Sequence, residues 1–152
     1  MTMAHYILYT DGGARGNPGP AGSGAVICDG DGRVLKNAHK AHGVATNNFA
    51  EYQAVVLALE TLKKMVPEAK RKECEVEVRM DSELVMRQLT GRYQIKEETL
   101  FLSFIKIWNI RVADFPRITF VHIPREQNKL ADEQSNIAMD ESERGPVQQA
   151  TL

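Results

Sequence analysis

The sequence predicts an α/β protein with one mixed five-stranded sheet and flanking helices. Three strand-like segments follow one another up to residue 41, and four later segments are predicted to be helical. Two further strand-like segments alternate with those helices, which gives the order βββαβααβα. Strands reached through helical crossovers usually pair in parallel. A chain of 152 residues is the length of a single domain.

The composition is that of a globular protein, with 43% apolar and 26% charged residues. It excludes collagen, coiled coil and disorder for the chain as a whole, and no apolar run approaches the ~20 residues of a membrane span. Residues 1–5 lack the pattern of a secretory signal. Cys28 and Cys74 lie too far apart in sequence for a metal-type pair, so we expect a reduced, cytoplasmic protein. A net charge of -1 argues against coating nucleic acid by bulk charge.

The first half of the chain contains the three consecutive strands and one long helix. Residues 6–10, 24–28 and 33–41 are the strands, and the turn sequence at 29–32 makes the second and third antiparallel. Thr46, Asn47 or Asn48 can cap the helix, which ends before Pro67. One helix face is predicted to be buried: Glu51, Ala54, Val55, Ala58, Leu59 and Leu62.

The second half alternates strands and helices. Residues 75–80 and 118–123 are strands, and Ser82 can cap a short helix that ends near Gly91. Asn128 can cap a last helix over 129–139. Between these lies a helix whose apolar stripe comprises Phe101, Phe104, Ile105, Trp108 and Val112. We expect residues 1–139 to form the domain, and 140–152 to be a polar, mobile tail.

Four carboxylates stand out as candidate functional groups. Asp11 and Asp81 end the first and fourth strands, and Asp132 lies in the first turn of the last helix. Each has an ordinary explanation as a turn or helix-terminus residue. Glu51 is harder to explain, because a carboxylate that faces a core is costly unless it is paired, hydrogen-bonded or metal-bound.

The predicted topology can bring these four side chains together. Parallel pairing of the first and fourth strands would make Asp11 and Asp81 neighbours, under the helix that carries Glu51. Four clustered carboxylates repel by a few kcal/mol per pair unless cations join them. Oxygen ligands suit Mg²⁺ or Mn²⁺, and two such ions serve phosphate chemistry.

A glycine- and proline-rich segment at 12–20 follows Asp11 directly. Six of the eleven glycines lie between residues 12 and 24, where the backbone could approach a bulky partner closely. The spacing is not that of a Walker A loop, since no Lys-Ser or Lys-Thr follows.

Four segments resemble the motifs of one family in the same order. Residues 9–20 (YTDGGARGNPGP), 46–51 (TNNFAE), 80–82 (MDS) and 128–132 (NKLAD) resemble those of type 1 ribonuclease H. The resemblance runs from about residue 5 to residue 139 and implies the ribonuclease H-like fold. It implies an endoribonuclease that hydrolyses the RNA strand of RNA/DNA hybrids, leaving 5′-phosphate and 3′-hydroxyl ends.

The resemblance also implies roles for individual residues. Asp11 would bridge two Mg²⁺ or Mn²⁺ ions, with Glu51 and Asp81 on the leaving-group side and Asp132 on the side of the attacking water. A hybrid has a wide, shallow minor groove that displays 2′-hydroxyls on one strand. The expected substrate-binding residues are Gly12, Gly13, Asn17, Asn47 and Asn48.

The chain departs from many relatives in two places. The family's product-release histidine could be His122, although its strand-like surroundings make a structural role equally expected. In a subgroup with a shorter loop, Arg125 would take part of that role. Residues 90–99 are too short for the basic protrusion of other members, so we expect weaker or more salt-sensitive binding.

Two other functions remain possible at this point. A non-cleaving hybrid-binding module would share the fold but should lack a carboxylate, and an ATPase or sugar kinase would need a longer chain with two lobes. The sequence indicates no membrane and no obligate protein partner. It leaves open the preferred metal, activity on double-stranded RNA and the oligomeric state.

Overall fold

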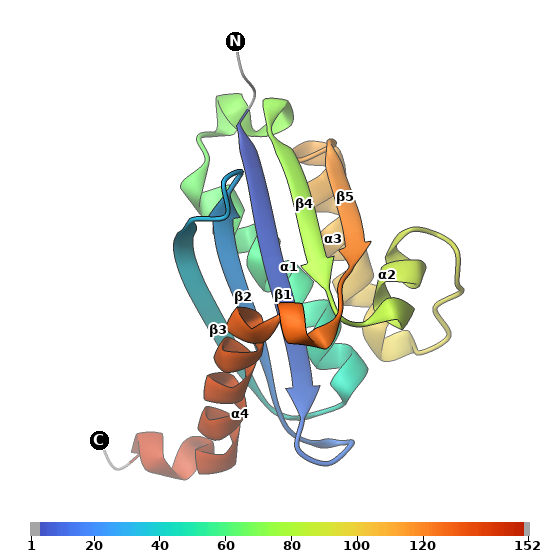
Figure 1. The fold of residues 1–152 in the computed structure, drawn as a ribbon. Helices are drawn as coiled ribbons and strands as arrows, with labels where there is room; N and C mark the ends of the chain where they lie inside the picture. Colours follow the sequence, from blue (N-terminus) through green and yellow to red (C-terminus); the bar gives the residue numbers. More distant parts are fainter. Residues whose placement is uncertain (1–3, 151–152) are drawn as a thin grey trace.

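The computed structural model describes the backbone of residues 4–150 and the side chains of residues 4–145. Its single sheet has the strand order β3-β2-β1-β4-β5, as Figure 1 shows. The strands are β1 (His5–Ala14), β2 (Gly19–Asp29), β3 (Val34–Ala45), β4 (Glu75–Met80) and β5 (Ile118–His122). β1, β2 and β3 pair antiparallel, while β4 pairs in parallel with both β1 and β5. The predicted mixed five-stranded sheet is therefore confirmed.

Helices cover both faces of the sheet. They are α1 (Asn47–Met65), α2 (Glu83–Leu89), α3 (Phe101–Ala113) and α4 (Lys129–Ala150). In Figure 1, α1 and α3 lie behind the sheet and α4 crosses in front of it. Three short 3-10 helices complete the described elements: η1 (Glu68–Glu73), η2 (Glu98–Leu100) and η3 (Arg125–Gln127). Within residues 4–150, no helix has the length and apolar content needed to cross a bilayer.

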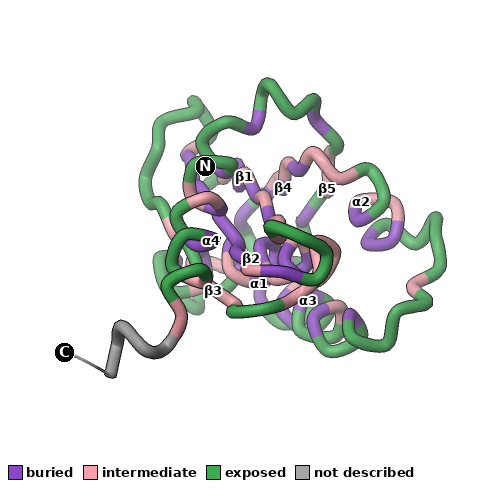
Figure 2. The backbone as a smooth tube through the Cα atoms, turned by 90° about the horizontal axis from the view of Figure 1, so that it is seen from below, coloured by how far each residue is buried: buried purple, intermediate pink, exposed green. Residues whose placement is uncertain are grey.

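The long helix α1 forms where its cap and its apolar stripe predict. The backbone N–H of Phe49 donates to Thr46 Oγ1 at 3.2 Å, which selects Thr46 among the three possible caps. The five apolar residues of the predicted stripe are buried against the sheet: Ala54, Val55, Ala58, Leu59 and Leu62. Figure 2 shows the buried segments concentrated where the central strands meet α1.

Two glycines let helices approach the sheet from opposite sides. A Cβ on Gly12 would lie 2.2 Å from the carbonyl oxygen of Ala50 in α1. A Cβ on Gly24 would lie 2.4 Å from the backbone nitrogen of Ser135 in α4. Successive positions in a strand face opposite sides, and Gly24 pairs with Asp11. Asp11 therefore faces α4, while Gly12 faces α1.

Several boundaries differ from the sequence-based expectation: β2 begins at Gly19 instead of 24, and β3 ends at Ala45 instead of 41. β1 does not end at Asp11 but continues to Ala14, because the glycine-rich segment pairs with β2 in register. The last helix continues beyond Met139, and its next residues make polar contacts: Ser142 Oγ donates to the carbonyl oxygen of Ala21 at 2.6 Å. Of the expected tail at 140–152, residues 151–152 lie outside the described residues.

The predicted buried face of α3 is wrong. The side chains that α3 buries are Ser103, Ile107 and Ile110. Four residues of the predicted stripe are exposed instead, namely Phe101, Ile105, Trp108 and Val112. Both faces of this helix carry apolar residues, so periodicity alone could not identify the inner one.

Candidate active site

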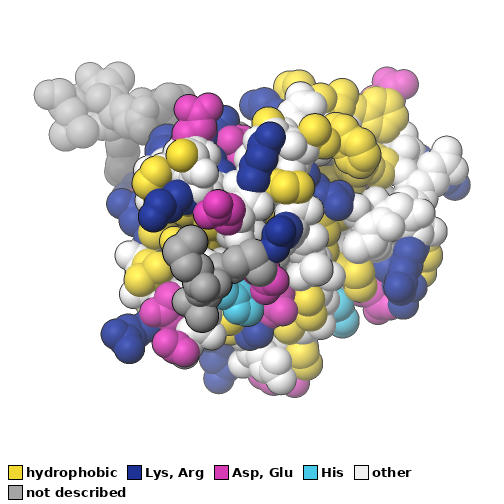
Figure 3. All heavy atoms as spheres, turned by 90° about the horizontal axis from the view of Figure 1, so that it is seen from above, with side chains coloured by type: hydrophobic (Ala, Val, Ile, Leu, Met, Phe, Trp, Pro, Cys, Tyr) yellow, Lys and Arg dark blue, Asp and Glu magenta, His cyan; other side chains and the backbone are white. Residues whose placement is uncertain are grey.

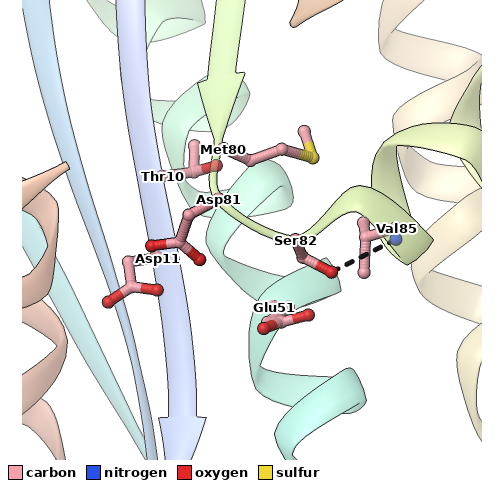
Figure 4. Close-up of a pocket in the computed structure, with 7 residues that line it drawn as sticks. All are labelled: Thr10, Asp11, Glu51, Met80, Asp81, Ser82 and Val85. Carbon is pink, nitrogen blue, oxygen red and sulfur yellow. Dashed lines mark hydrogen bonds between the residues drawn. The ribbon is translucent and has the colours of Figure 1, made fainter. Parts of the chain in front are cut away.

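The structure brings the four predicted carboxylates to one edge of the sheet. Parallel pairing of β1 with β4 ends at Thr10 and Met80, so Asp11 and Asp81 are the next residues of neighbouring strands. α1 carries Glu51 to this edge from behind the sheet, and the first turn of α4 carries Asp132 from in front. Figure 4 shows the carboxylates of Asp11, Asp81 and Glu51 around a common pocket.

Two adjoining hollows connect these side chains. A small pocket of about 10 Å³ is lined by Thr10, Asp11, Glu51, Met80, Asp81, Ser82 and Val85. An open groove of about 370 Å³ is lined by Asp11, Gly12, Gly13, Ala14, Arg15, Asn47, Glu51, Arg125, Asp132, Ser135, Asn136 and Met139. Asp11 and Glu51 line both. The small pocket has the volume of about one water-sized sphere, which is also the size range of a single ion.

Burial makes two of these carboxylates reluctant to carry a charge. Burial raises the pKa of Asp11 to about 8, and repulsion from Asp81 and Asp132 adds to the rise. Burial also raises the pKa of Glu51 to about 7, although a hydrogen bond from Ser82 opposes the rise. Near neutral pH the site therefore favours an added positive charge, either as protons or as a cation.

Asn128 ties three of the carboxylate-bearing segments together. Its Nδ2 donates to the carbonyl oxygen of Thr10 at 2.9 Å and to Asp81 Oδ2 at 3.2 Å. The backbone carbonyl oxygen of Asn128 accepts the backbone N–H of Asp132 at 3.1 Å. The predicted position of the cap is confirmed, since α4 begins at Lys129, but the side-chain amide of Asn128 bonds between β1 and β4 instead of capping the helix. Asn128 Oδ1 is buried without a hydrogen-bond partner, so a hard acceptor stands beside the carboxylates.

Two serines complete the surroundings of the carboxylates. Ser135 Oγ lies 3.1 Å from Asp11 Oδ2 and 2.9 Å from the carbonyl oxygen of Asp132. Ser82 contacts Glu51 and also caps α2, since its Oγ accepts the N–H of Val85 at 3.2 Å. The sequence pattern predicts only a capping role for Ser82, and it does not distinguish Ser135 from other helical serines. The available signal was spacing, because Ser135 follows Asp132 by three residues on the same helix face.

A buried polar chain supports the turn of α1 that carries Glu51. Ser23 Oγ donates to the carbonyl oxygen of Ala50 at 2.6 Å, and His42 Nε2 lies 2.7 Å from the same Oγ. The hydroxyl has one proton and a carbonyl only accepts, so Nε2–H of His42 is the donor to Ser23. His42 is the extra residue of a β-bulge, since Ala21 pairs with Gly43 and Gly22 with Ala41.

The predicted substrate-binding residues divide into two groups. Gly12, Gly13 and Asn47 line the groove. Asn17 is exposed beside it, and its Oδ1 accepts the N–H of Asn47 at 3.1 Å. Asn48 is not among the residues that line the groove, and its Nδ2 donates to Glu97 Oε1 at 3.0 Å.

The two predicted product-release residues also differ in position. Arg125 lines the groove, and its charge partly opposes the rise that burial causes in the pKa of Glu51. His122 is exposed at the end of β5 and is not among the residues that line the groove.

The donor set fits a hard divalent cation. Its members are carboxylate oxygens with an unpartnered amide oxygen nearby, and oxygen donors of this kind suit Mg²⁺ or Mn²⁺. In the part of the chain that is described, no three His, Cys, Asp or Glu side chains form a closed metal-binding cluster. A cation bound among these carboxylates would relieve the repulsion between their like charges.

Known proteins similar to this chain share its fold and much of its sequence. A family described as "Reverse transcriptase-like" matches residues 9–138. The structure of LC11-RNase H1, isolated from compost, is 51% identical with a TM-score of 0.85, over 92% of this chain and 99% of that one. The structure of LC11-RNase H1 in complex with an RNA/DNA hybrid is 50% identical with a TM-score of 0.81, over 90% and 98%.

Curated relatives are similar but longer. Ribonuclease HI of Halobacterium salinarum is 36% identical over 134 residues, which are 88% of this chain and 64% of that protein. The bifunctional protein Rv2228c of Mycobacterium tuberculosis is 38% identical over 135 residues. This chain spans 35% of the length of that relative.

Proposed function

Because this chain belongs to the type 1 ribonuclease H family, we propose that it is an endoribonuclease acting on RNA/DNA hybrids. It would hydrolyse the RNA strand and leave 5′-phosphate and 3′-hydroxyl ends. The observation that carries the proposal is the convergence of four carboxylates on two hollows that share Asp11 and Glu51, with Asp81 in the small pocket and Asp132 in the groove. The hybrid complex of LC11-RNase H1 supports the choice of substrate.

The four carboxylates would hold two divalent ions, either Mg²⁺ or Mn²⁺. When bound, such ions activate the attacking water and stabilise the leaving oxygen. Asp11 lines both hollows and would be shared between the ions, with Glu51 and Asp81 on one side and Asp132 on the other. Asn128 and Ser135 would orient Asp81 and Asp11 through the contacts described above.

The groove would recognise shape and 2′-hydroxyls rather than base sequence. Gly12 and Gly13 offer backbone that a strand can approach closely, and Asn47 and Asn17 offer neutral polar groups beside it. Asn48 would contact substrate only if it left Glu97. Arg125 is placed to contact a phosphate and to assist product release, a role that His122 could share only after its segment moved.

The two free, buried cysteines, Cys28 and Cys74, support the further proposal of a reducing, cytoplasmic location.

Cleavage of a labelled hybrid tests the proposal. Purified protein is incubated with an RNA/DNA hybrid and with double-stranded RNA, in Mg²⁺ or in Mn²⁺, and product ends are mapped. We expect cleavage of the hybrid, and Asp11→Asn should lower kcat by at least about 1,000-fold while hybrid binding remains. Asp31→Asn, in an exposed turn, is the matched control and should cleave normally.

Two results would count against a nuclease. One is the absence of cleavage by folded protein in both metals. The other is an Asp81→Asn variant that loses hybrid binding rather than turnover, as a non-cleaving hybrid-binding module would.

A further inference from the structure

Helix α3 is apolar on two faces, and only one of them is covered. The inner face buries Ile107 and Ile110. On the outer face, Phe101, Ile105, Trp108 and Val112 are 44%, 51%, 52% and 61% exposed, and Leu102 beside them is 66% exposed. Helices that are apolar all round are normally buried all round. We call these five residues the outer stripe.

The spacing of the outer stripe is that of a helix–helix seam. Its four aligned members follow one another at intervals of four, three and four residues, the a/d pattern of helices that pack along their length. Viewed from above, Figure 3 shows hydrophobic side chains gathered at one edge of the molecule, on the side where α3 lies in Figure 1.

The size of the outer stripe suits a small protein interface. Its exposed side-chain surface amounts to roughly 500 Å², the upper range for the largest apolar patch of a monomer. Two such faces packed together would bury roughly 1,000 Å², the lower bound for a specific interface.

The charges around the stripe favour a second copy in antiparallel orientation. Glu97 and Glu98 stand at the beginning of the helical segment, and Arg111 stands in its last turn. An antiparallel copy brings the basic end of each α3 beside the acidic end of the other. The two helix dipoles then point in opposite directions, which is also favourable. A parallel copy would place like charges together.

We propose that this chain forms a two-fold symmetric dimer in solution, through antiparallel packing of the outer stripes of two α3 helices. The two-fold axis passes between Ile105 and Trp108, so that Ile105 of one copy contacts Trp108 of the other. Phe101 of each copy then contacts Val112 of the other. Such an isologous contact closes on itself and leaves no stripe exposed.

Trp108 provides a direct test, because it is the only tryptophan of the chain. Dilution from about 100 to 1 µM should move its fluorescence emission to longer wavelength, as the ring becomes exposed to water. Light scattering should give about 34 kDa at the upper concentration, twice the 17.0 kDa of one chain. Ile105→Lys should give 17.0 kDa throughout and no concentration-dependent shift.

Matched variants separate the proposed seam from general surface hydrophobicity. Leu35→Lys replaces an apolar residue of β3 that is 46% exposed, and it should dimerise like the wild type. Should Ile105→Lys fail to fold by circular dichroism, Val112→Lys at the more exposed end takes its place. Neither position lies in the proposed active site, so hybrid cleavage should persist in these variants.

Engineered cysteines test the antiparallel arrangement itself. The double variant Phe101→Cys, Val112→Cys should form disulfide-linked dimers on mild oxidation. Phe101→Cys alone should not, because equivalent positions would lie about 16 Å apart along the two helices. A wild type that stays monomeric at all concentrations would overturn the proposal, as would dimers that persist in both lysine variants.

Discussion

At the scale of single residues, burial and like charges oppose the ionised form of the site's carboxylates. Asp11 and Glu51 both have raised pKa values, with burial as the main cause. When folding raises the pKa of a group, the free energy of unfolding decreases as the pH rises from the pKa of the unfolded state to that of the folded state. The clustered carboxylates therefore lower the stability of the metal-free protein and favour the binding of cations.

Removing the charge of Asp11 should stabilise the metal-free protein. The pKa of this carboxyl is about 8 when folded and near 4 when unfolded, so its ionisation destabilises the fold increasingly between those values. In EDTA at pH 8.5, we expect Asp11→Asn to raise Tm by roughly 4–8 °C, or about 2 kcal/mol. At pH 4 the difference should vanish. Thermal unfolding of Asp31→Asn, which should match the wild type at both pH values, is the control.

His42 should make the protein sensitive to acid. Burial lowers the pKa of His42 to about 4, below its usual 6.5, and the charge of Lys40 contributes. A depressed histidine pKa means that stability is lost as the pH falls from 6.5 to 4. His42→Gln can still donate to Ser23 but cannot titrate. Urea unfolding at pH 7 and pH 4.5 should show a smaller loss for this variant, by on the order of 1 kcal/mol.

The exposed His5→Gln variant is the control for that measurement. If His42→Gln and the wild type lost the same stability on acidification, the assigned role of the imidazole would be wrong.

At the scale of elements, the carboxylates meet because β4 ends where β1 continues. β4 pairs with β1 up to Met80, and β1 then runs on to Ala14 beside β2 alone. This leaves the carbonyl oxygen of Thr10 for Asn128, and it opens the edge where α1 and α4 add their acidic residues. α1 can pack this closely on β1 because residue 12 is a glycine.

Substituting Gly12 should displace α1. An alanine Cβ there would meet the backbone of Ala50 at 2.2 Å, and backbone cannot rotate away as a side chain can. We expect Gly12→Ala to cost at least about 2 kcal/mol of unfolding free energy. Gly13→Ala is the matched control for stability, because its nearest contact would be Met139 at 3.6 Å, an ordinary distance. Equal unfolding midpoints in urea would refute this account of the glycine.

Sequence patterns predicted those elements whose apolar residues lie on one face only. The stripe of α1 and the alternation in β4 both identified the buried side correctly, and parallel pairing of the first and fourth strands was confirmed. The face of α3 was not predictable in this way, since both of its faces are apolar.

Sequence patterns also could not predict the contacts that polar side chains make in the site. The sequence shows that Asn128 can cap a helix, but only the fold shows that Thr10 leaves a carbonyl for it. Likewise, His42 acts on Ala50 through Ser23 only because a β-bulge turns it inward. Contacts between residues distant in sequence depend on register and bulges, which local patterns do not encode.

At the scale of the whole molecule, the proposed hybrid substrate is a polyanion, and this nearly neutral protein would have to bind it through a few local charges. The net charge is -1, and the arginines that line the groove are Arg15 and Arg125. Arg15 is already paired with Asp140 at 2.6 Å and Glu143 at 3.0 Å. Arg125 is therefore the better candidate for a phosphate contact.

Salt dependence should reveal that contact. Each phosphate contact adds about 0.7–0.9 to the slope of log affinity against log salt. We expect Arg125→Ala to weaken hybrid binding and to reduce the slope by about that amount. Arg33→Ala, in the exposed turn before β3, should change neither. An unchanged slope for Arg125→Ala, measured by fluorescence anisotropy in Ca²⁺ to prevent turnover, would remove Arg125 from the substrate interface.

Anomalous diffraction from crystals soaked in Mn²⁺, with a nuclease-resistant hybrid bound, tests most directly whether the acidic side chains of β1, α1, α4 and the end of β4 act together. We predict two manganese peaks among Asp11, Glu51, Asp81 and Asp132, both lost in Asp11→Asn. Manganese bound elsewhere on the protein, or no peak among these four residues at saturating Mn²⁺, would contradict this.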